Sequence, residues 1–224
     1  MGMAVWSMVV VVFLGTAALL YPRRAGPRSI MVVAHPDDEF IFGGEALLRD
    51  PNDWYVVVVT HGPGAPGADG LRQLEFSESM RAMGIAEDHY EMLDFVDGKD
   101  QLGWDRPRLL QRIQTIIRRY RMTTVASHNV VGEYGHPQHR MCHETLLPVL
   151  THVFCTNARS SFSERRAHLY DHVLYRSQLR VLRGLREMAR QTDLVPIAQC
   201  PADTAWARPG SDNYVDPAAQ RNLL

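Results

Sequence analysis

Four ionisable side chains follow one short apolar run near the start of the chain. His35, Asp37, Asp38 and Glu39 come directly after residues 29–33, which read as a buried strand. Adjacent carboxylates repel each other, so a strand end holds them when a cation is present or when water solvates them. His35 and Asp38 are three residues apart and can reach one ion across a turn, which leaves Asp37 free. A solvated acidic turn that favours the N-terminus of the next helix is the alternative, so this segment alone leaves metal binding open.

A second group of candidate ligands follows a later apolar run. Five of the ten histidines lie between residues 128 and 152, and His136 and His139 flank the expected start of a helix. Two histidines and a carboxylate from two strand ends are a ligand set typical of zinc, and three protein ligands leave a position open for water. His143 is expected to be an ordinary helix residue, because Arg140 stands where the HExxH motif has its glutamate base. The histidines without a spacing argument are expected to be structural: His61, His128 and His152.

Strands and helices alternate along the part of the chain that positions these residues. The strongest strand signal is the uninterrupted β-branched run at residues 54–60. Further strands are expected at residues 29–33, 89–93 and 123–127. Helices are expected at residues 40–49, 71–83, 105–120 and 137–153, and from 157 to about 192. Apolar strands that alternate with helices predict an α/β fold with a Rossmann-like, mostly parallel sheet and helices on both faces. In such a sheet the functional site lies at the carboxyl ends of the strands.

The two motifs together resemble those of a known family. AHPDDE after a first strand and GHPxH after a later one are similar to the LmbE-like, or PIG-L, family of zinc-dependent de-N-acetylases, over about residues 29–152. The resemblance implies one Zn²⁺ per chain, held by His35, Asp38 and His139. It also implies a metal-dependent amidase that removes the N-acetyl group from N-acetylglucosaminyl-phosphatidylinositol, a GPI-anchor precursor. Another glycan or a soluble glucosaminyl conjugate is the alternative substrate.

The same resemblance implies roles for the side chains around the metal. Asp37 is implied as the general base, His136 as an assisting group at the tetrahedral intermediate and Tyr134 as a stabiliser of the oxyanion. Arg72, in an Arg-x-x-Glu motif, is implied as a substrate-binding residue. Many family members have an aspartate where this chain has Gln138. A neutral amide there predicts that His136 is less basic than in those relatives.

The N-terminal residues have the composition of a membrane anchor. No side chain from 1 to 22 is charged, and a helix of that length spans roughly 33 Å, about the thickness of a bilayer core. A basic linker is expected at 23–28, and a single LmbE-like deacetylase domain at 29–224. Because arginines follow the apolar run and no basic residue precedes it, the domain is expected in the cytosol, at the endoplasmic reticulum in a eukaryote. A cleaved signal peptide is the alternative.

Two other classes of function have some support in the sequence. Gly62, Gly64 and Gly67 satisfy the GxGxxG pattern of dinucleotide-binding oxidoreductases, but Pro63 and Pro66 lack the N–H groups that would hold a pyrophosphate. A mobile substrate loop or a plain turn is the preferred reading of this run. An inactive metal-binding adaptor should lack Asp37, which is present.

Charge and cysteine content limit which binding partners and which cellular compartment are expected. A net charge of -1 gives no reason to expect a nucleic-acid partner. The three cysteines form no CxxC pair, which argues against disulfides and fits a reducing compartment. Arginines at helical spacing form one basic stripe, which is expected to be either a solvated face or a contact for anionic lipid headgroups. The stripe consists of Arg176, Arg180, Arg183, Arg186 and Arg190.

Overall fold

A six-stranded sheet forms the centre of the protein. The computed structural model describes residues 26–61, 69–98, 103–156, 162–172 and 174–200. The strands lie in the order β3-β2-β1-β4-β5-β6. The first five in this order are parallel, and β6 is antiparallel to β5. Their bounds are β1 Ser29–Val33, β2 Trp54–Thr60, β3 Tyr90–Phe95, β4 Thr124–Ser127, β5 His152–Thr156 and β6 Thr192–Pro196.

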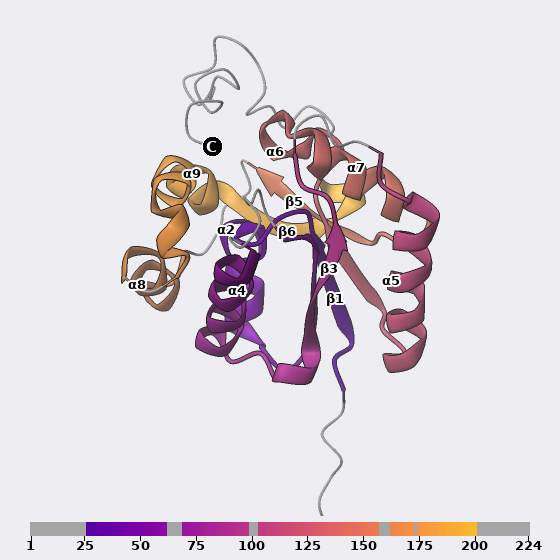
Figure 1. Cartoon of the computed structure of the whole chain (residues 1–224), viewed down its shortest axis with the longest axis horizontal. Helices are drawn as coiled ribbons and strands as arrows, with labels where there is room; N and C mark the ends of the chain where they lie inside the picture. The colour runs from indigo at the N-terminus through magenta and orange to yellow at the C-terminus, as the bar shows by residue number, and fades with distance from the viewer. Residues whose placement is uncertain (1–25, 62–68, 99–102, 157–161, 173, 201–224) are drawn as a thin grey trace, which may run out of the picture.

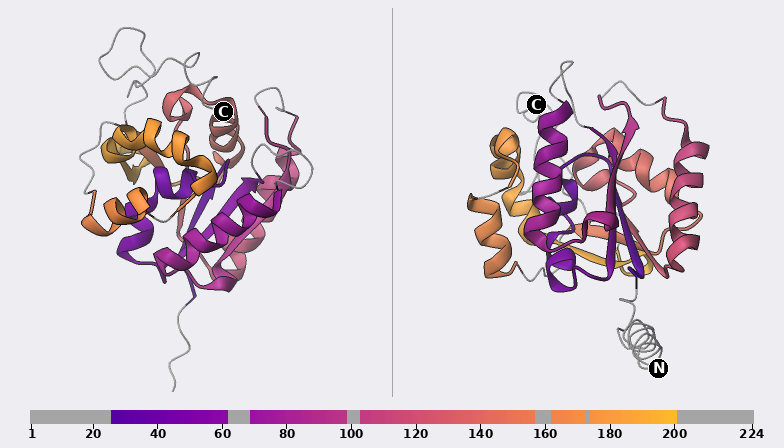
Figure 2. Two further views of the ribbon diagram at one scale, coloured as in Figure 1. Left: turned by 60° about the vertical axis from the view of Figure 1, so that its left-hand side comes forward. Right: turned by 60° about the horizontal axis from the view of Figure 1, so that its bottom comes forward.

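Helices cover both faces of the sheet, as the alternation of elements predicts. In Figures 1 and 2, α4, α8 and α9 lie on one side of the strands, and α5 and α7 lie on the other. The longer helices are α4 Asp69–Met83, α5 Arg106–Tyr120, α7 Pro137–Leu146, α8 Glu164–His172 and α9 Leu179–Gln191. Met31 and Val33 of β1 pack into one of these layers, whereas Ile30 and Val32 pack into the other. Both faces of β1 are therefore buried, because successive side chains of a strand point to opposite faces.

Several predicted elements agree closely with the observed ones. The strands at 29–33 and 54–60 have the predicted bounds, and those at 89–93 and 123–127 are shifted by one or two residues. The helix expected from residue 105 begins at Arg106, and the side chain of its N-cap residue Asp105 accepts a hydrogen bond from the Arg108 N–H at 3.0 Å. This cap satisfies one of the N–H groups that a helix start leaves without a partner.

The single helix predicted over 40–49 is wrong, because two short helices occupy this segment. α2 (Asp38–Ile41) is separated from α3 (Gly44–Arg49) by Phe42 and Gly43. A Cβ atom on Gly43 would lie 2.4 Å from Met31 Cε and 2.9 Å from the Glu39 carbonyl oxygen. Glycine is therefore needed here for the chain to turn this close to β1.

The prediction for the C-terminal third needs two corrections. The helix expected to reach residue 153 ends at Leu146, and β5 follows it. The helical pattern expected to about 192 is divided into α8, a 3₁₀ turn at Arg176–Gln178 (η2) and α9, and it is followed by the unpredicted strand β6. Short apolar runs do not distinguish a strand from a helix by periodicity, and β6 is a polar edge strand that depends on pairing with β5.

The sheet order brings the two motif-bearing strands together. β1 and β4 are hydrogen-bonded neighbours, and the chain leaves β1 toward β2 and β3 on one side and reaches β5 from β4 on the other. This reversal of strand order is a topological switch point, where α/β sheets open a crevice at the carboxyl ends of the strands. The segments after β1 and after β4 therefore meet at one place.

The sparse, odd number of cysteines argued against a disulfide framework, but the structure contains one disulfide. Cys155 in β5 and Cys200 after β6 form a disulfide with a Cα–Cα distance of 5.6 Å, across 45 residues of sequence. Cys142 is free and buried. The sequence pattern did not reveal the pair because it depends on the antiparallel pairing of β5 with β6.

The predicted anchor at 1–22 and the glycine run at 62–67 lie outside the described residues. Within the described part of the chain, no helix is long and apolar enough to cross a membrane.

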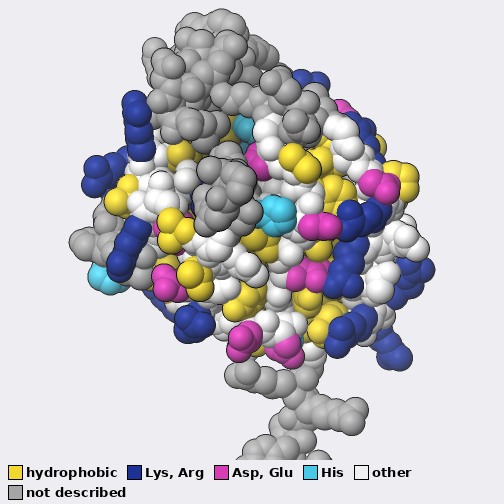
Figure 3. All heavy atoms as spheres, viewed as in Figure 1, with side chains coloured by type: hydrophobic (Ala, Val, Ile, Leu, Met, Phe, Trp, Pro, Cys, Tyr) yellow, Lys and Arg dark blue, Asp and Glu magenta, His cyan; other side chains and the backbone are white. Residues whose placement is uncertain are grey.

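The predicted arginine stripe lies within the described residues, on η2 and α9. Arg180, Arg183 and Arg190 are exposed, whereas Leu182, Leu185 and Met188 of α9 are buried against the core. In Figure 3, basic side chains gather at two edges of this face of the molecule, over α8 and α9 and over α5.

The disulfide gives a prediction about stability. Replacing Cys200 with serine should lower the free energy of unfolding by about 2–4 kcal/mol, because the unfolded chain regains the freedom of a long closed loop. Urea unfolding of the wild type and of Cys200→Ser, with and without reductant, measures this difference. Reductant should lower the stability of the wild type to that of the variant, and an unchanged midpoint in reductant would contradict the pairing.

Candidate metal centre

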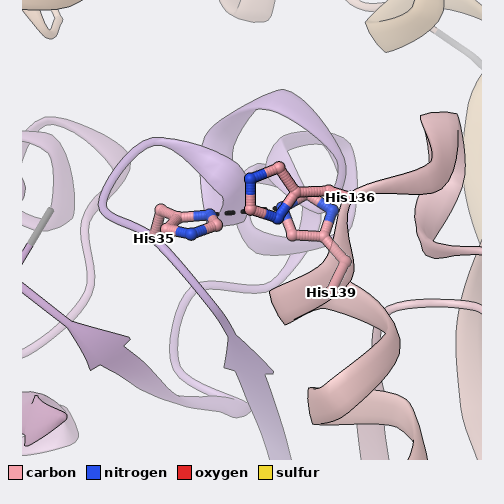
Figure 4. A group of neighbouring side chains, drawn as sticks. All are labelled: His35, His136 and His139. Atoms are coloured by element: carbon pink, nitrogen blue, oxygen red, sulfur yellow. Dashed lines mark hydrogen bonds between the residues drawn. The ribbon is translucent and has the colours of Figure 1, made fainter. Parts of the chain in front are cut away.

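Three side chains from two neighbouring strands converge at the carboxyl edge of the sheet. His35 and Asp38 follow β1, and His139 lies in the first turn of α7, beyond β4. His35 Nδ1 lies 3.1 Å from Asp38 Oδ2, and His139 Nε2 lies 3.2 Å from each of these two atoms. In Figure 4 a dashed line joins a ring nitrogen of His35 to a ring nitrogen of His139, and His136 lies beside them. Ligand atoms of a tetrahedral zinc site lie about 3.3 Å apart, so this triangle of atoms fits one ion.

A hydrogen bond to Gln138 fixes which nitrogen of His35 carries the proton. The Val96 carbonyl can only accept, so the Gln138 amide nitrogen faces it at 3.1 Å and the Gln138 oxygen faces His35 Nε2 at 2.8 Å. His35 Nε2 is therefore the donor to Gln138, and Nδ1, which faces Asp38, is the nitrogen that can bind a metal ion once it carries no proton. Contrary to the sequence-based reading, the Gln138 side chain does not act on His136, which it contacts through its backbone N–H at 3.3 Å.

Glu133 fixes the orientation of His139 in the same way, and the sequence analysis missed it. The fully buried Glu133 Oε2 accepts from His139 Nδ1 at 2.7 Å and from His128 Nδ1 at 2.8 Å. Burial raises the pKa of the Glu133 carboxyl, but His128 and His139 outweigh burial and bring it down to about 2. The lone pair on His139 Nε2 consequently faces the triangle. Carboxylate–histidine pairs of this kind are the usual outer support of a metal-binding histidine.

The charges at the triangle call for a cation. Burial lowers the pKa of the His35 ring, but Asp38 more than offsets burial and raises it well above its usual value. Burial raises the pKa of the Asp38 carboxyl, but His139 and His35 hold it well below its usual range. Each group thus favours positive charge at the place where three acceptor atoms meet. A divalent cation satisfies all three at once, so these residues fit a zinc ion.

His128 lies against the triangle without being free to bind a metal. Its ring stacks on that of His139 with centroids 3.8 Å apart, and its Nε2 lies 3.6 Å from Asp38 Oδ2. The same Nε2 accepts a hydrogen bond from the Ala34 N–H at 3.0 Å, while Nδ1 donates to Glu133. Both ring nitrogens are therefore in use, so the structural role expected for His128 agrees with its hydrogen bonds, although its place in the cluster was not predicted.

Asp37 lies beside the triangle in a left-handed backbone conformation. Its φ angle is 116°, a region in which non-glycine residues are strained by about 1–3 kcal/mol. Its buried carboxylate lies 3.6 Å from Arg72 Nη2. Burial raises the pKa of Asp37, Arg72 lowers it and Asp38 raises it again, which brings it to about 7. A carboxyl group with this pKa can exchange a proton near neutral pH.

His136 and Tyr134 are neutral groups near the triangle. Burial and the neighbouring His139 and His35 lower the pKa of His136 far below its usual value. Because His136 Nδ1 accepts the Gln138 N–H, its proton lies on Nε2, where it can be donated in a hydrogen bond. Burial, together with Asp38 and Asp37, raises the pKa of Tyr134 well above its usual value, so its phenol is a donor as well.

A pocket of about 160 Å³ opens over these residues. Apart from the deeply buried His139, every predicted site residue lines it: His35, Asp37, Asp38, Arg72, Tyr134 and His136. The lining residues that the sequence analysis missed are Asp97, Gly98, Gln178, Val181 and Leu185. Three of these come from η2 and α9, far along the chain from either motif, and no spacing signal in the sequence marks them.

The motif-bearing half of the chain matches a family model. The model is described as PIG-L: GlcNAc-PI de-N-acetylase, and it covers residues 30–150, more than half of the 224 residues. The chain belongs to the PIG-L family. The match includes both motifs and ends before β5, so the α9 wall of the pocket lies outside it.

Individual relatives of this PIG-L family chain are distant. An uncharacterized protein, L374, of Acanthamoeba polyphaga mimivirus is 26% identical over 147 residues, and a probable N-acetylglucosaminyl-phosphatidylinositol de-N-acetylase of Schizosaccharomyces pombe is 25% identical over 156 residues. The matches cover 60% and 65% of this chain, which spans 63% of the length of each relative. N,N'-diacetylchitobiose deacetylase from Pyrococcus horikoshii aligns over 89% of this chain and 81% of its own, with 15% identity and a TM-score of 0.41.

The geometry predicts that replacing a proposed ligand and replacing a residue that orients a ligand reduce zinc affinity by different amounts. Asp38→Ala should abolish zinc binding, whereas Glu133→Gln should weaken it by about 10–100-fold. The amide removes the negative charge behind the two histidines, and its NH2 group must face donors, either the Asn129 N–H or the histidine N–H groups. Zinc content and competition with a chromophoric chelator measure both effects. Full zinc content in Asp38→Ala would contradict the assignment of the ligands. Exposed Glu144, which lies on the same helix as His139, provides the control Glu144→Gln, which should bind zinc like the wild type.

Proposed function

We propose that this protein is a zinc-dependent hydrolase that removes the N-acetyl group from an N-acetylglucosaminyl conjugate. The observation that carries the proposal is the meeting of the three acceptor atoms of His35, Asp38 and His139 beside the buried carboxylate of Asp37. All of these residues except the deeply buried His139 line one pocket. Membership of the PIG-L family supports the same reaction class. The presence of Asp37 argues against an inactive adaptor, and a nicotinamide oxidoreductase has no support beyond the glycine run.

Asp37 is the general base in this proposal. A zinc ion at the triangle supplies Lewis acidity and lowers the pKa of water toward ~7. Asp37 accepts a proton from the attacking water as the C–O bond forms at the acetyl carbon. It then returns this proton to the sugar nitrogen as the C–N bond breaks, which releases acetate and a free amine. The Asp38 carboxylate contacts both His35 and His139, whereas the Asp37 carboxylate lies against Arg72, so Asp37 can serve as the base while Asp38 serves as the ligand.

The neutral donors around the pocket stabilise the charge that develops on the acetyl oxygen. His136 Nε2–H and the Tyr134 hydroxyl can each donate a hydrogen bond to that oxygen. Since the pKa of His136 is far below neutrality, we assign it hydrogen-bond donation and not proton transfer.

Arg72 and Asp97 are proposed to bind the sugar. Among the described residues, Nε and Nη1 of the buried Arg72 and Oδ2 of Asp97 have no hydrogen-bond partner, and both residues line the pocket. Two donors and one acceptor without partners match the hydroxyl groups of a sugar, each of which both donates and accepts.

The conjugate is proposed to be lipid-linked, as N-acetylglucosaminyl-phosphatidylinositol is. The support consists of the description of the family model, the name of the yeast relative and the uncharged run at 1–22. Another glycan or a soluble conjugate is the alternative. β1 starts at Ser29 and runs roughly 17 Å toward the pocket, so the chain enters the sheet at the edge opposite the site. We therefore propose that the domain tilts so that its pocket faces the membrane surface when it binds a lipid-linked sugar. In that orientation the exposed arginines of α9 contact anionic headgroups.

We also propose a single-pass membrane protein with its catalytic domain in the cytosol, at the endoplasmic reticulum in a eukaryote. The arginines after the apolar run support this orientation. The Cys155–Cys200 disulfide favours the opposite side, because disulfides persist in oxidising compartments.

The role of Asp37 predicts a loss of turnover without a loss of metal. Asp37→Asn should keep its zinc but lose 10²-fold or more in kcat, because the amide cannot accept the proton of water. In the wild type, kcat/KM should rise with pH through an apparent pKa at or below about 7, since the ionised Asp37 is the active form and a bound cation favours it further. Rates across N-acetylglucosaminyl substrates at controlled zinc measure this. A variant that turns over like the wild type would show that another group is the base.

The proposed anchor predicts a difference between substrates. Deleting residues 1–24 should leave activity on a soluble N-acetylglucosaminyl substrate nearly unchanged and reduce activity on a membrane-embedded one, because the anchor raises the local concentration of substrate. Protease protection in sealed microsomes locates the domain. A protected or secreted domain cleaved near Tyr21 would favour a lumenal or secreted glycan deacetylase instead.

A further inference from the structure

Glu39 holds the strained backbone of Asp37 in place through a hydrogen bond. Glu39 Oε2 accepts a hydrogen bond from the Asp37 N–H at 3.0 Å, and the Glu39 side chain is completely buried. A left-handed φ at a non-glycine residue persists only where the surroundings hold it. Glu39 provides this restraint at the residue to which the proposed function assigns the base.

Tyr175 in turn holds Glu39. The Tyr175 hydroxyl donates a hydrogen bond to Glu39 Oε1, the oxygen that does not accept the Asp37 N–H. Ser79 Oγ also donates to this oxygen, but from 3.4 Å. Tyr175 is 1% exposed, so water does not replace its hydroxyl. The orientation of the Glu39 carboxyl group therefore depends mainly on Tyr175.

The Tyr175 ring also supports the second group that holds Asp37. The Arg72 guanidinium carbon lies 6.0 Å from the centre of this ring. Arg72 Nη2 donates to the Pro36 carbonyl, next to Asp37, and lies 3.6 Å from the Asp37 carboxylate. One side chain thus contacts both restraints on Asp37, on its backbone through Glu39 and on its carboxylate through Arg72.

Tyr175 comes from a part of the chain that the family model does not cover. It precedes η2, which is joined to α4 by hydrogen bonds from the Ser177 backbone and hydroxyl to Glu75. We propose that Tyr175, acting through Glu39 and Arg72, is a positioning residue that aims Asp37 at its proton. This inference rests on the proposed function, and it assigns to the C-terminal segment a part in catalysis beyond lining the pocket.

The variant Tyr175→Phe tests this directly, since it removes one hydroxyl and keeps the ring. We expect kcat to fall by ~10-fold or more with little change in KM or zinc content, because small misplacements of a reacting group are costly in rate. Tyr170→Phe is the matched control. It also removes a buried tyrosine hydroxyl, which donates to the Leu182 carbonyl at 2.6 Å, outside the pocket lining. Equal kcat in the two variants would overturn the proposal, even if both lose stability.

A second pair of variants separates hydrogen bonding from charge at Glu39. Glu39→Gln can still accept the Asp37 N–H and can donate to the Tyr175 oxygen, so kcat should stay near the wild-type value, whereas Glu39→Leu should reduce it as Tyr175→Phe does. A glutamine variant as slow as the leucine variant would overturn the positioning role.

Amide hydrogen exchange tests the inference without any activity measurement. In zinc-loaded protein, the Asp37 N–H should exchange faster in Tyr175→Phe than in Tyr170→Phe, because its acceptor is no longer fixed. If the wild type deacetylates no substrate, the proposed function fails, but this comparison still decides the positioning role. Equal exchange at Asp37 in the two variants would exclude it.

Discussion

The convergence of three side-chain atoms that can bind one metal ion is the constraint on which the rest of the structure depends. His35 Nδ1, Asp38 Oδ2 and His139 Nε2 lie within 3.2 Å of one another, and hydrogen bonds to the other nitrogen of each ring hold the two rings in this orientation. Positive charge at this place, carried by ring protons or by a metal ion, offsets the charge of the Asp38 carboxylate. The adjacency of β1 and β4, the turn that starts α2 and the proline-led start of α7 all bring these atoms together.

The buried polar groups around the triangle each orient a different part of the site. Glu133 and Gln138 fix the ligand histidines, while Glu39 fixes the backbone next to them. Asp37 and Asp38 are adjacent and chemically identical, yet their pKa values move in opposite directions, because Asp38 faces two histidines and Asp37 faces mainly a desolvated pocket with Arg72. Environment, not residue type, thus separates the pKa values of two adjacent aspartates, which is the difference that their proposed roles as base and ligand require.

The C-terminal segment closes the site from outside the family match. η2 and α9 supply one wall of the pocket, and Tyr175 and Ser177 fasten this segment to Glu39 and Glu75. β6 and the disulfide then tie the end of the described chain to β5. The edge of the sheet that carries both motifs is thereby combined with a pocket wall from a segment that the family model does not cover.

The sequence by itself determined those elements and motifs that can be recognised from residues close together in the chain. The β-branched runs at 29–33 and 54–60, the Asp105 cap and the alternation of strands with helices were sufficient to predict a parallel sheet with both motifs at one edge. Only the tertiary structure decided which side chains support those motifs. Glu133, the contact of Gln138 with His35, β6 and the disulfide all depend on segments brought together by packing. Hydrophobic periodicity and helix caps are properties of neighbouring residues, whereas a buried hydrogen bond between Glu39 and Tyr175 joins residues 136 positions apart and leaves no local pattern.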